Sequence, residues 1–170
     1  MNKSNTDKLH MDIALRAAQE SKCPRKQVGC CLLLESGMIA IGFNGHASGG
    51  PNEWEFKEQG DPEVVHAELN CLGKLLEEGL SAKGATTYIT YSPCLDCAKL
   101  LVRAKVKRVV YLEEYRKTEG IDYLAKYGVQ VEKYSEHSHC FPCVATIVRD
   151  DRTEVYEFTH CVSKHLHTSS

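Results

Sequence analysis

Two short motifs in the middle of the chain constrain its fold more than any other feature. The sequence reads H-A-E at residues 66–68 and P-C-L-D-C at residues 93–97. The apolar spacing after each motif predicts that each one opens a helix, over residues 66–78 and 94–104. Because a helix N-terminus favours an anionic thiolate, a fold that joins these two helix starts would build a metal site there.

The side chains in these motifs form a set of zinc ligands. One imidazole and two thiolates, from His66, Cys94 and Cys97, leave the fourth position for water, as a catalytic zinc site requires. Glu68 lies two residues from His66, where it can take a proton from that water and pass it on. The order H-x-E followed by P-C-x-x-C is the signature of zinc deaminases, in which hydroxide attacks C4 of cytosine or C6 of adenine.

Two other interpretations of the motifs stay open at this point. The C-x-x-C pair could be half of a structural zinc site or a redox pair. The whole set could also be a zinc module that only binds partners. Glu68 favours the enzyme, because a structural zinc site has no need of a carboxylate beside its ligands.

Helix and strand patterns alternate over the first 134 residues and predict an α/β fold. The expected architecture is a three-layer α/β/α sandwich around one mixed five-stranded sheet. From Ser135 the pattern changes, and two alternating stretches around Asp150-Asp151 predict a β-hairpin. We therefore expect a catalytic domain over residues 1–134 and a Cys/His-rich extension over residues 135–170. The predicted helices span residues 7–21, 66–78, 94–104 and 119–127, and the strands 29–34, 38–43, 85–91, 107–112, 129–131, 144–149 and 153–158.

Composition and charge exclude several other classes of protein. Hydrophobic residues make up 42% of the 170 positions, enough for a folded domain with a core. The net charge of −2 gives no overall attraction to nucleic acid or to an anionic membrane. No apolar run reaches the roughly 18 residues that a spanning helix needs, and the N-terminal segment lacks the apolar core of a secretory signal. We expect a cytoplasmic protein whose nine cysteines are metal ligands, catalytic groups or small buried residues.

The chain resembles the cytidine and deoxycytidylate deaminase superfamily, and within it the deoxycytidylate (dCMP) deaminases of phage and bacterial type. The resemblance runs from about Leu9 to about Lys133. Beside the two motifs, it rests on S-K-C-P-R-K-Q-V-G at 21–29, G-F-N-G at 42–45, Y-R at 115–116 and G-I-D at 120–122. The G-F-N-G segment, followed by Gly49-Gly50 in a long loop, is what favours the dCMP branch.

This resemblance implies a hydrolase that acts on the C–N bond of a cyclic amidine. It would convert dCMP to dUMP and ammonia, which supplies dUMP for thymidylate synthesis. The resemblance implies that Asn44 contacts the sugar and that Arg25 and Tyr115 help to hold the phosphate. We expect the cytosine ring beside Ala67 and Ser92. Simpler roles are also open, namely a tight turn for Asn44, a surface cation for Arg25 and a packed aromatic ring for Tyr115.

Substrate and assembly are open within this family. The same reaction on dCTP, or on both nucleotides, is a close alternative. A tRNA- or DNA-editing deaminase is a more distant one, which the net charge and the acidic residues of the 44–65 loop disfavour. The relatives imply a homo-oligomer, commonly a hexamer, with dCTP or dTTP as regulators and Mg²⁺ beside a triphosphate regulator. We expect no nucleic-acid or membrane partner, and the host cytoplasm as the location if a phage encodes the chain.

The C-terminal segment carries a second group of metal-binding residue types. A C-x-x-C pair, Cys140 and Cys143, precedes the first hairpin strand, and Cys161 with His165 follows the second. The two ends of a hairpin converge, so these residues predict a second, structural zinc, with His160 or His137 as substitute ligands. A solvated His-rich tail with free thiols is the alternative. Because Glu53 stands where a ligand partner for Cys23 is expected, we do not expect the structural zinc that some phage-type relatives carry there.

Overall fold

The structure is a computed structural model that describes residues 3–47, 61–135, 143–149 and 152–158. Its contacts divide the chain into two compact units, Met1–Tyr134 and Ser135–Ser170. Each unit is described by itself. None of the described helices combines the length and the apolar character that a membrane span needs.

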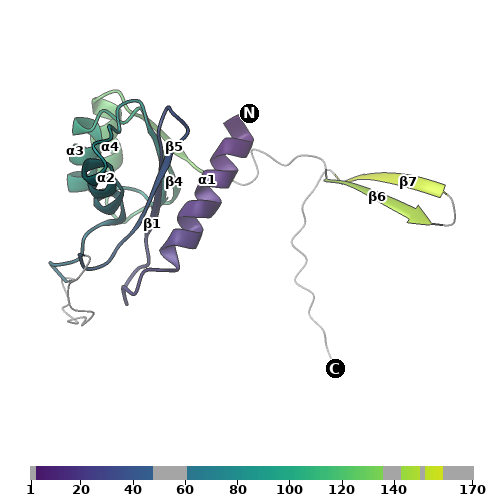
Figure 1. The fold of residues 1–170 in the computed structure, drawn as a ribbon, viewed down its shortest axis with the longest axis horizontal. Coiled ribbons are helices and arrows are strands. Elements are labelled where there is room, and N and C mark those ends of the chain that lie inside the picture. Colours follow the sequence, from purple (N-terminus) through teal and green to yellow (C-terminus); the bar gives the residue numbers. More distant parts are fainter. Residues whose placement is uncertain (1–2, 48–60, 136–142, 150–151, 159–170) are drawn as a thin grey trace. The chain divides into compact units, whose positions relative to one another are not determined.

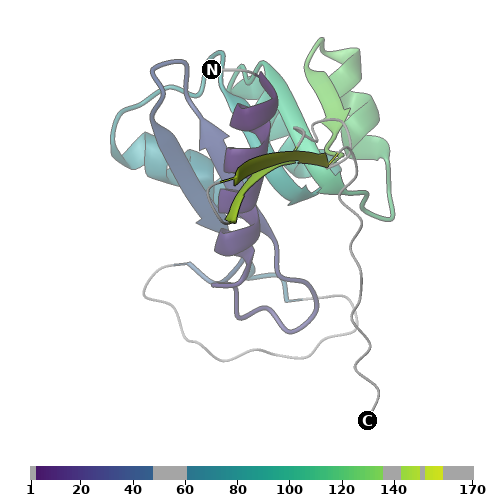
Figure 2. The same cartoon turned by 90° about the vertical axis from the view of Figure 1, so that its right-hand side faces the viewer.

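The first unit has three layers, with the sheet between α1 on one side and α2, α3 and α4 on the other (Figure 1). Figure 2 shows the same sheet turned, with α1 lying across it. The strands run in the order β2-β1-β3-β4-β5. This mixed five-stranded sheet confirms the predicted fold class. The elements are α1 Lys3–Ala18, β1 Gly29–Leu33, β2 Ile39–Phe43, α2 Ala67–Glu77, β3 Thr86–Tyr91, α3 Leu95–Arg103, β4 Arg108–Glu113, α4 Glu119–Lys126 and β5 Gln130–Lys133.

Strand direction explains where a site can form in this sheet. β1 pairs antiparallel with β2 and β3, whereas β3, β4 and β5 are parallel to one another. The carboxyl ends of β3 and β4 therefore lie together at one edge, and each leads into a loop and then a helix. Open sheets of this kind place ligands in the crevice outside the carboxyl ends of their strands.

Alternating side chains give the sheet two separate apolar faces. Cys31 and Tyr88 face α1, whereas their neighbours Cys30 and Ile89 face α2 and α3. The larger core lies on the side of α2, α3 and α4, because three helices cover that face. Cys30, Cys31 and Cys71 are fully buried, so these three are of the small buried kind that the sequence allows for its cysteines.

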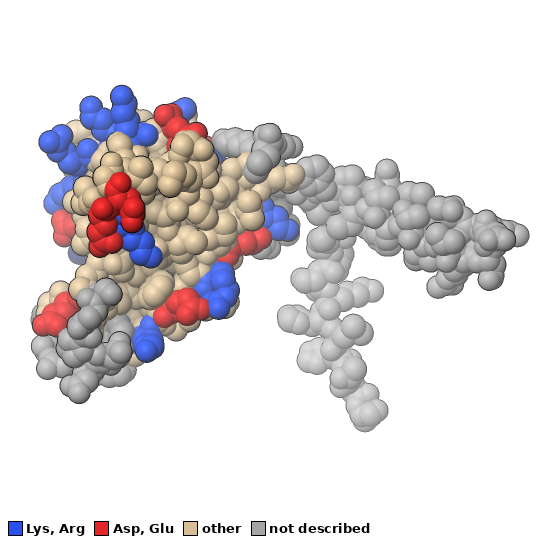
Figure 3. Space-filling view, in the orientation of Figure 1, with Lys and Arg blue, Asp and Glu red and all other residues tan. Residues whose placement is uncertain are grey.

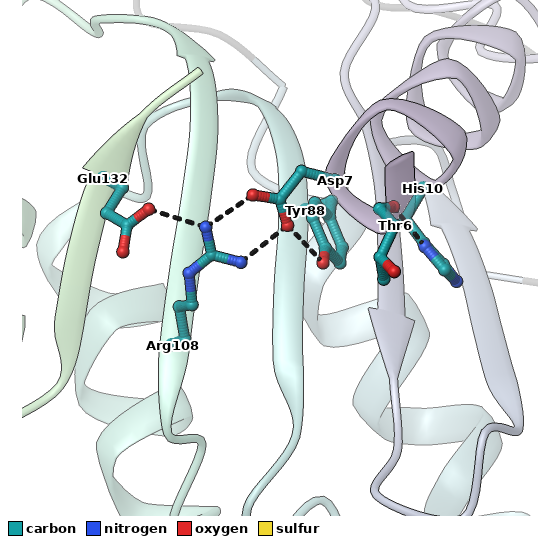
Figure 4. Close-up of polar contacts among 6 residues, drawn as sticks. All are labelled: Thr6, Asp7, His10, Tyr88, Arg108 and Glu132. Carbon is teal, nitrogen blue, oxygen red and sulfur yellow. Dashed lines mark hydrogen bonds and ion pairs between the residues drawn. The ribbon is translucent and has the colours of Figure 1, made fainter. Parts of the chain in front are cut away.

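A buried ionic network ties α1 to the sheet (Figure 4). The Arg108 guanidinium donates to both carboxylate oxygens of Asp7, each at 2.7 Å, and to Glu132 at 2.6 Å. The Tyr88 hydroxyl donates to the same Asp7 carboxylate at 2.8 Å, and its ring stacks on His10. One helix and three strands therefore meet at a single guanidinium, which fixes where α1 lies on the sheet.

The second unit contains an antiparallel hairpin of β6 Cys143–Arg149 and β7 Arg152–Phe158. Cys143 is the register partner of Phe158, and Arg149 is that of Arg152. This is the hairpin that the sequence predicts around Asp150-Asp151. Its register means that the chain enters β6 and leaves β7 at the same end of the hairpin.

Candidate functional site

Two helix starts meet beside the carboxyl end of β3, as the motifs predict. His66 is the N-cap residue of α2 and Cys94 is that of α3, and both have an extended backbone. Sequence patterns placed each of these residues inside its helix, whereas the structure has each one just before it. Each side chain therefore leaves the backbone just before the first helical turn. The Cys97 backbone N–H donates to the Cys94 sulfur at 3.5 Å, as in a helix N-cap.

The three predicted ligands come together. The His66 Nδ1 and the sulfurs of Cys94 and Cys97 all lie within 4.8 Å of one another. His66 Nδ1 is 3.3 Å from Cys97 Sγ and 3.5 Å from Cys94 Sγ. A tetrahedral zinc, with Zn–N of about 2.0 Å and Zn–S of about 2.3 Å, separates a nitrogen and a sulfur ligand by about 3.5 Å. The donor set and its spacing therefore fit zinc, through Nδ1 of the imidazole.

The electrostatics of this triad already favour a thiolate. Hydrogen bonds from the Cys97 thiol, and then from His66, lower the pKa of Cys94 to about 4. The hydrogen bond to Cys94, helped by burial, raises the pKa of Cys97. The hydrogen bond with Cys94 also raises the pKa of His66. The lowered pKa favours the thiolate form of Cys94, which is the form that binds a metal ion.

Glu68 lies in the first turn of α2 and is only 4% exposed. Burial is the main reason that its pKa rises to about 7, while its own backbone N–H and His66 act in the opposite direction. A carboxyl with a pKa near 7 can both accept and return a proton at neutral pH. Its side chain also reaches the Cys97 side chain, so it lies against the ligand triad.

Asn44 lies close to the triad, but its side-chain amide is hydrogen-bonded mainly to other groups of the protein. Gly45 and Val65 form an isolated antiparallel bridge, which places Asn44 opposite His66. The Asn44 Oδ1 accepts from the Val28 amide at 2.7 Å, and its Nδ2 donates to the Lys26 carbonyl at 2.8 Å. The amide of Asn44 therefore holds the loop between α1 and β1 against the end of β2.

The remaining predicted contacts lie around the same edge. Ala67 is fully buried, and Ser92 is buried with its hydroxyl accepting from the Tyr115 amide at 2.8 Å. This bond holds the loop after β4 against the turn that leads to Cys94. Arg25 is exposed on the loop between α1 and β1.

Two glycines let backbone segments approach the site closely. A Cβ on Gly42 would lie 2.5 Å from the Ala67 carbonyl oxygen, so only glycine lets α2 start this close to β2. A Cβ on Gly120 would collide with the Pro93 carbonyl oxygen, which α4 packs against. Both helix starts in the triad are thus supported by close backbone contacts.

Sequence reasoning did not single out Lys26, Tyr91 or Asp61. Lys26 Nζ lies 3.9 Å from the centre of the Tyr91 ring and 5.6 Å from that of Tyr115. His46, which had no partner visible in the sequence, pairs with Asp61 at 2.8 Å, both side chains being about nine-tenths buried. These pairs join segments 15 to 89 residues apart, so no local pattern could have indicated them.

Some predicted residues lie outside the described part of the chain. These are Glu53 in the long loop, the second-zinc residues Cys140, Cys161 and His165, and the substitute ligands His137 and His160. Cys143 is the first residue of β6. Among the described residues, His66, Cys94 and Cys97 form the one cluster of metal-ligating side chains.

Several known proteins are similar in sequence to most of the first unit. Deoxycytidylate deaminase of Enterobacteria phage T4 is 31% identical over 165 residues, covering 71% of this chain and 86% of the relative. Human deoxycytidylate deaminase is 33% identical over 113 residues, covering 61% and 62% of the two chains. ComE operon protein 2 of Bacillus subtilis is 33% identical over 58% of this chain and 54% of its own length. The chain thus spans little more than half the length of the human and Bacillus relatives.

Solved structures agree with these sequence matches. A dCMP deaminase from the cyanophage S-TIM5, in complex with dCMP and dUMP, superposes with a TM-score of 0.73 at 40% identity, over 79% of this chain and 100% of that chain. A tRNA:A34 deaminase, at 22% identity and a TM-score of 0.54, shares the fold alone. Residues 4–113 match the family described as the cytidine and deoxycytidylate deaminase zinc-binding region. The chain therefore belongs to the cytidine and deoxycytidylate deaminase family.

Proposed function

We propose that this protein is a hydrolytic deaminase that converts dCMP and water to dUMP and ammonia. The observation that carries the proposal is the buried Glu68 carboxyl, with a pKa of about 7, against the triad of His66, Cys94 and Cys97. The phage T4 and human relatives are named deoxycytidylate deaminases, and the S-TIM5 enzyme binds dCMP and dUMP. These names support the same substrate for this chain.

His66, Cys94 and Cys97 would hold the zinc ion. Zinc in such a site makes hydroxide available near neutral pH. Glu68 takes a proton from the attacking water and delivers it to N3 of the ring as oxygen bonds to C4. The remaining proton of that water, now on the oxygen at C4, then passes through Glu68 to the amino group; the C4–N4 bond breaks as the C4=O bond forms, and ammonia leaves. Since Glu68 ends each cycle in its starting state, the reaction needs no other proton carrier.

We assign the substrate contacts to the loops around the triad. Ala67 and Ser92 would flank the cytosine ring, Asn44 would face the sugar, and Arg25 with Tyr115 would face the phosphate. The proximity of Asn44 to His66 supports this arrangement. Asn44 Nδ2 carries two hydrogens; one donates to the Lys26 carbonyl, and we assign the other to the sugar.

Two features disfavour a polymeric nucleic acid as the substrate. The net charge is −2, and acidic side chains interrupt the basic ones on the face shown in Figure 3. A phosphate backbone is held by clustered positive charge, so a mixed surface favours a single nucleotide. We likewise propose no membrane partner.

The C-terminal unit is proposed as a separate Cys/His-rich extension with a structural zinc, following a catalytic domain over residues 1–134. The register of β6 and β7 supports the site, because Cys143 is the partner of Phe158. Cys140 stands three residues before Cys143, and Cys161 stands three residues after Phe158. In the sequence the two pairs therefore flank the end at which the hairpin begins and finishes, with His165 four residues after Cys161.

The assembly is proposed as a homo-oligomer, a hexamer by resemblance to the family. Exposed leucines on α2 and α3 support a subunit contact on the first unit, because burying large apolar side chains stabilises the association of subunits. They are Leu69, Leu76 and Leu100, at 41%, 77% and 40% exposure. Regulation by dCTP or dTTP, with Mg²⁺ beside the triphosphate, is part of the same proposal.

We place the enzyme in the cytoplasm, and in the host cytoplasm if a phage encodes it. Six cysteines have described side chains, and all six are free thiols. Free thiols are usual in a reducing compartment.

A substrate panel tests the function. The purified protein is incubated with dCMP, dCTP, deoxycytidine, cytidine and adenosine-containing RNA, and ammonia release is followed for each. We expect turnover of dCMP above all others. Preferred turnover of dCTP would reassign the substrate, and no turnover by the zinc-loaded protein would contradict the enzyme itself.

A further inference from the structure

Three segments that are far apart in the sequence meet at Lys26. This residue lies on the loop between α1 and β1, Tyr91 ends β3, and Tyr115 follows β4. The Lys26 ammonium is 3.9 Å from the centre of the Tyr91 ring and 5.6 Å from that of Tyr115. An ammonium within about 6 Å of an aromatic ring is attracted to its face. The two rings therefore hold this charge in one place.

The backbone of Lys26 is fixed as well. Asn44 Nδ2 donates to the Lys26 carbonyl at 2.8 Å, and the Val28 amide donates to Asn44 Oδ1 at 2.7 Å. The side chain of Gln27 donates to the Ser21 carbonyl at 2.6 Å, which closes the loop on itself. A lysine on an exposed loop usually samples many rotamers, whereas this one is restrained at both ends.

Tyr115 is hydrogen-bonded to the turn that carries Cys94, and Tyr91 leads into that turn from the end of β3. The Tyr91 hydroxyl bonds to Glu113, and the Tyr115 amide donates to Ser92 Oγ at 2.8 Å. Ser92 is two residues before Cys94. The cation is thus tied to the edge of the sheet where the triad lies, through Tyr91 on one side and Asn44 on the other.

We infer that Lys26 is a specificity-determining residue, whose ammonium pairs with the phosphate of the nucleotide and favours dCMP over the uncharged nucleoside. The inference rests on the proposed function and adds a residue to the contacts assigned there. A lysine offers three donors and a compact charge, and stacking on one ring face leaves its other side open to an anion. Because the rings hold it in place before substrate arrives, little ordering cost is left for binding.

Substitution at Lys26 separates charge from structure. We expect Lys26→Met to lower kcat/KM for dCMP by about 10-fold to 100-fold, the range for losing one charged hydrogen bond, mainly through KM. Turnover of deoxycytidine, and binding of deoxyuridine, should not change. Lys26→Arg should restore much of the dCMP activity, because it keeps the charge. Lys22→Met, an exposed lysine on the same loop, is the matched control and should behave as the wild type.

A pair of Tyr91 variants tests the aromatic support. Tyr91→Phe keeps the ring and removes the hydroxyl bonded to Glu113, so KM for dCMP should stay within about 2-fold. Tyr91→Leu removes the ring and should raise KM toward that of Lys26→Met. Equal effects of the two Tyr91 variants would contradict the role of the ring.

The outcomes distinguish this inference from the proposed function. Calorimetric binding of dUMP is measured beside turnover, since binding needs no chemistry. A wild type that binds dUMP without deaminating dCMP contradicts the function alone, and Lys26→Met should still weaken dUMP binding. If Lys26→Met lowers activity on dCMP and deoxycytidine equally, or leaves dUMP binding unchanged, the inference is overturned while the function stands.

Discussion

At the scale of single residues, Glu68 carries the first prediction. Its carboxyl is buried and its pKa is about 7, so it can exchange protons at neutral pH. Glu68→Gln keeps the size and the polarity of the side chain but cannot exchange a proton. We expect turnover of dCMP to fall by about 10²-fold to 10⁴-fold, the usual contribution of a general acid–base group. Ammonia release measures the fall, and metal analysis should find the catalytic zinc retained.

An exposed acid at the C-cap of the same helix provides the control. Glu78→Gln, just beyond the end of α2, should leave turnover within about 2-fold of wild type. Survival of turnover in Glu68→Gln, with zinc bound, would show that another group moves the protons.

The roles of the site residues differ in how well the sequence predicts them. The ligands His66, Cys94 and Cys97 could be predicted because their motifs are local and each opens a helix. The stacking of Lys26 on Tyr91 could not, because it depends on the loop before β1 reaching the end of β3. Asn44 lies between these cases, since its motif marks the edge of the site but not its bonds to Val28 and Lys26.

At the scale of elements, α1 is held by the buried charge of Arg108. Arg108→Met leaves the Asp7 carboxylate buried without its cation, and breaking such a pair costs about 3–5 kcal/mol. Both side chains are less than a tenth exposed, so solvent screens the pair little. Urea unfolding should show this loss of stability. The double variant Asp7→Asn, Arg108→Met should lose less stability than the sum of the losses in the two single variants, because both single variants break the same ion pair.

Arg103→Met, on the exposed end of α3, is the control and should change the free energy of unfolding by less than about 0.5 kcal/mol. Additive losses in the Asp7 and Arg108 double variant would mean that the two side chains do not stabilise the fold as a pair.

A glycine substitution tests how α4 supports the site. Gly120→Ala would push a Cβ into the Pro93 carbonyl oxygen, and relieving such a clash costs about 1–3 kcal/mol. Because Pro93 precedes Cys94, we expect weaker zinc binding as well as a lower Tm. Gly73→Ala is the matched control, because nothing lies within 4 Å of its Cβ in the middle of α2. It should raise stability by about 0.5–1 kcal/mol. Unchanged zinc affinity in Gly120→Ala would separate α4 from the metal site.

The order of elements could be predicted, but their ends could not. Apolar periodicity placed the first helix at residues 7–21, whereas α1 runs from Lys3 to Ala18. The helix ends before Ser21, whose hydroxyl donates to Asn44 Oδ1 at 2.7 Å. To make this contact, the chain has to leave helical geometry. At its other end Lys3 to Thr6 carry no apolar pattern, so nothing local marks that first turn.

At the scale of the whole molecule, the two units are expected to bind one zinc each. The first unit has a triad with zinc spacing, and the sequence has Cys and His residues just before β6 and just after β7, whose register joins these two ends of the hairpin. Metal analysis of the purified full chain should therefore give two zinc ions per chain. A chelator should abolish turnover, and added zinc should restore it.

Paired substitutions in the full chain then assign each ion. The variant Cys94→Ser, Cys97→Ser should keep one zinc and lose turnover, because the catalytic ligands are gone. The variant Cys140→Ser, Cys161→Ser should also keep one zinc, but it should still deaminate dCMP. The free energy of binding a structural zinc contributes to folding. The C-terminal unit should therefore lose thermal stability when its ion is lost, while the first unit should not. One zinc per wild-type chain, lost only with Cys94 and Cys97, would leave the C-terminal histidines and cysteines as a solvated tail and remove the second site.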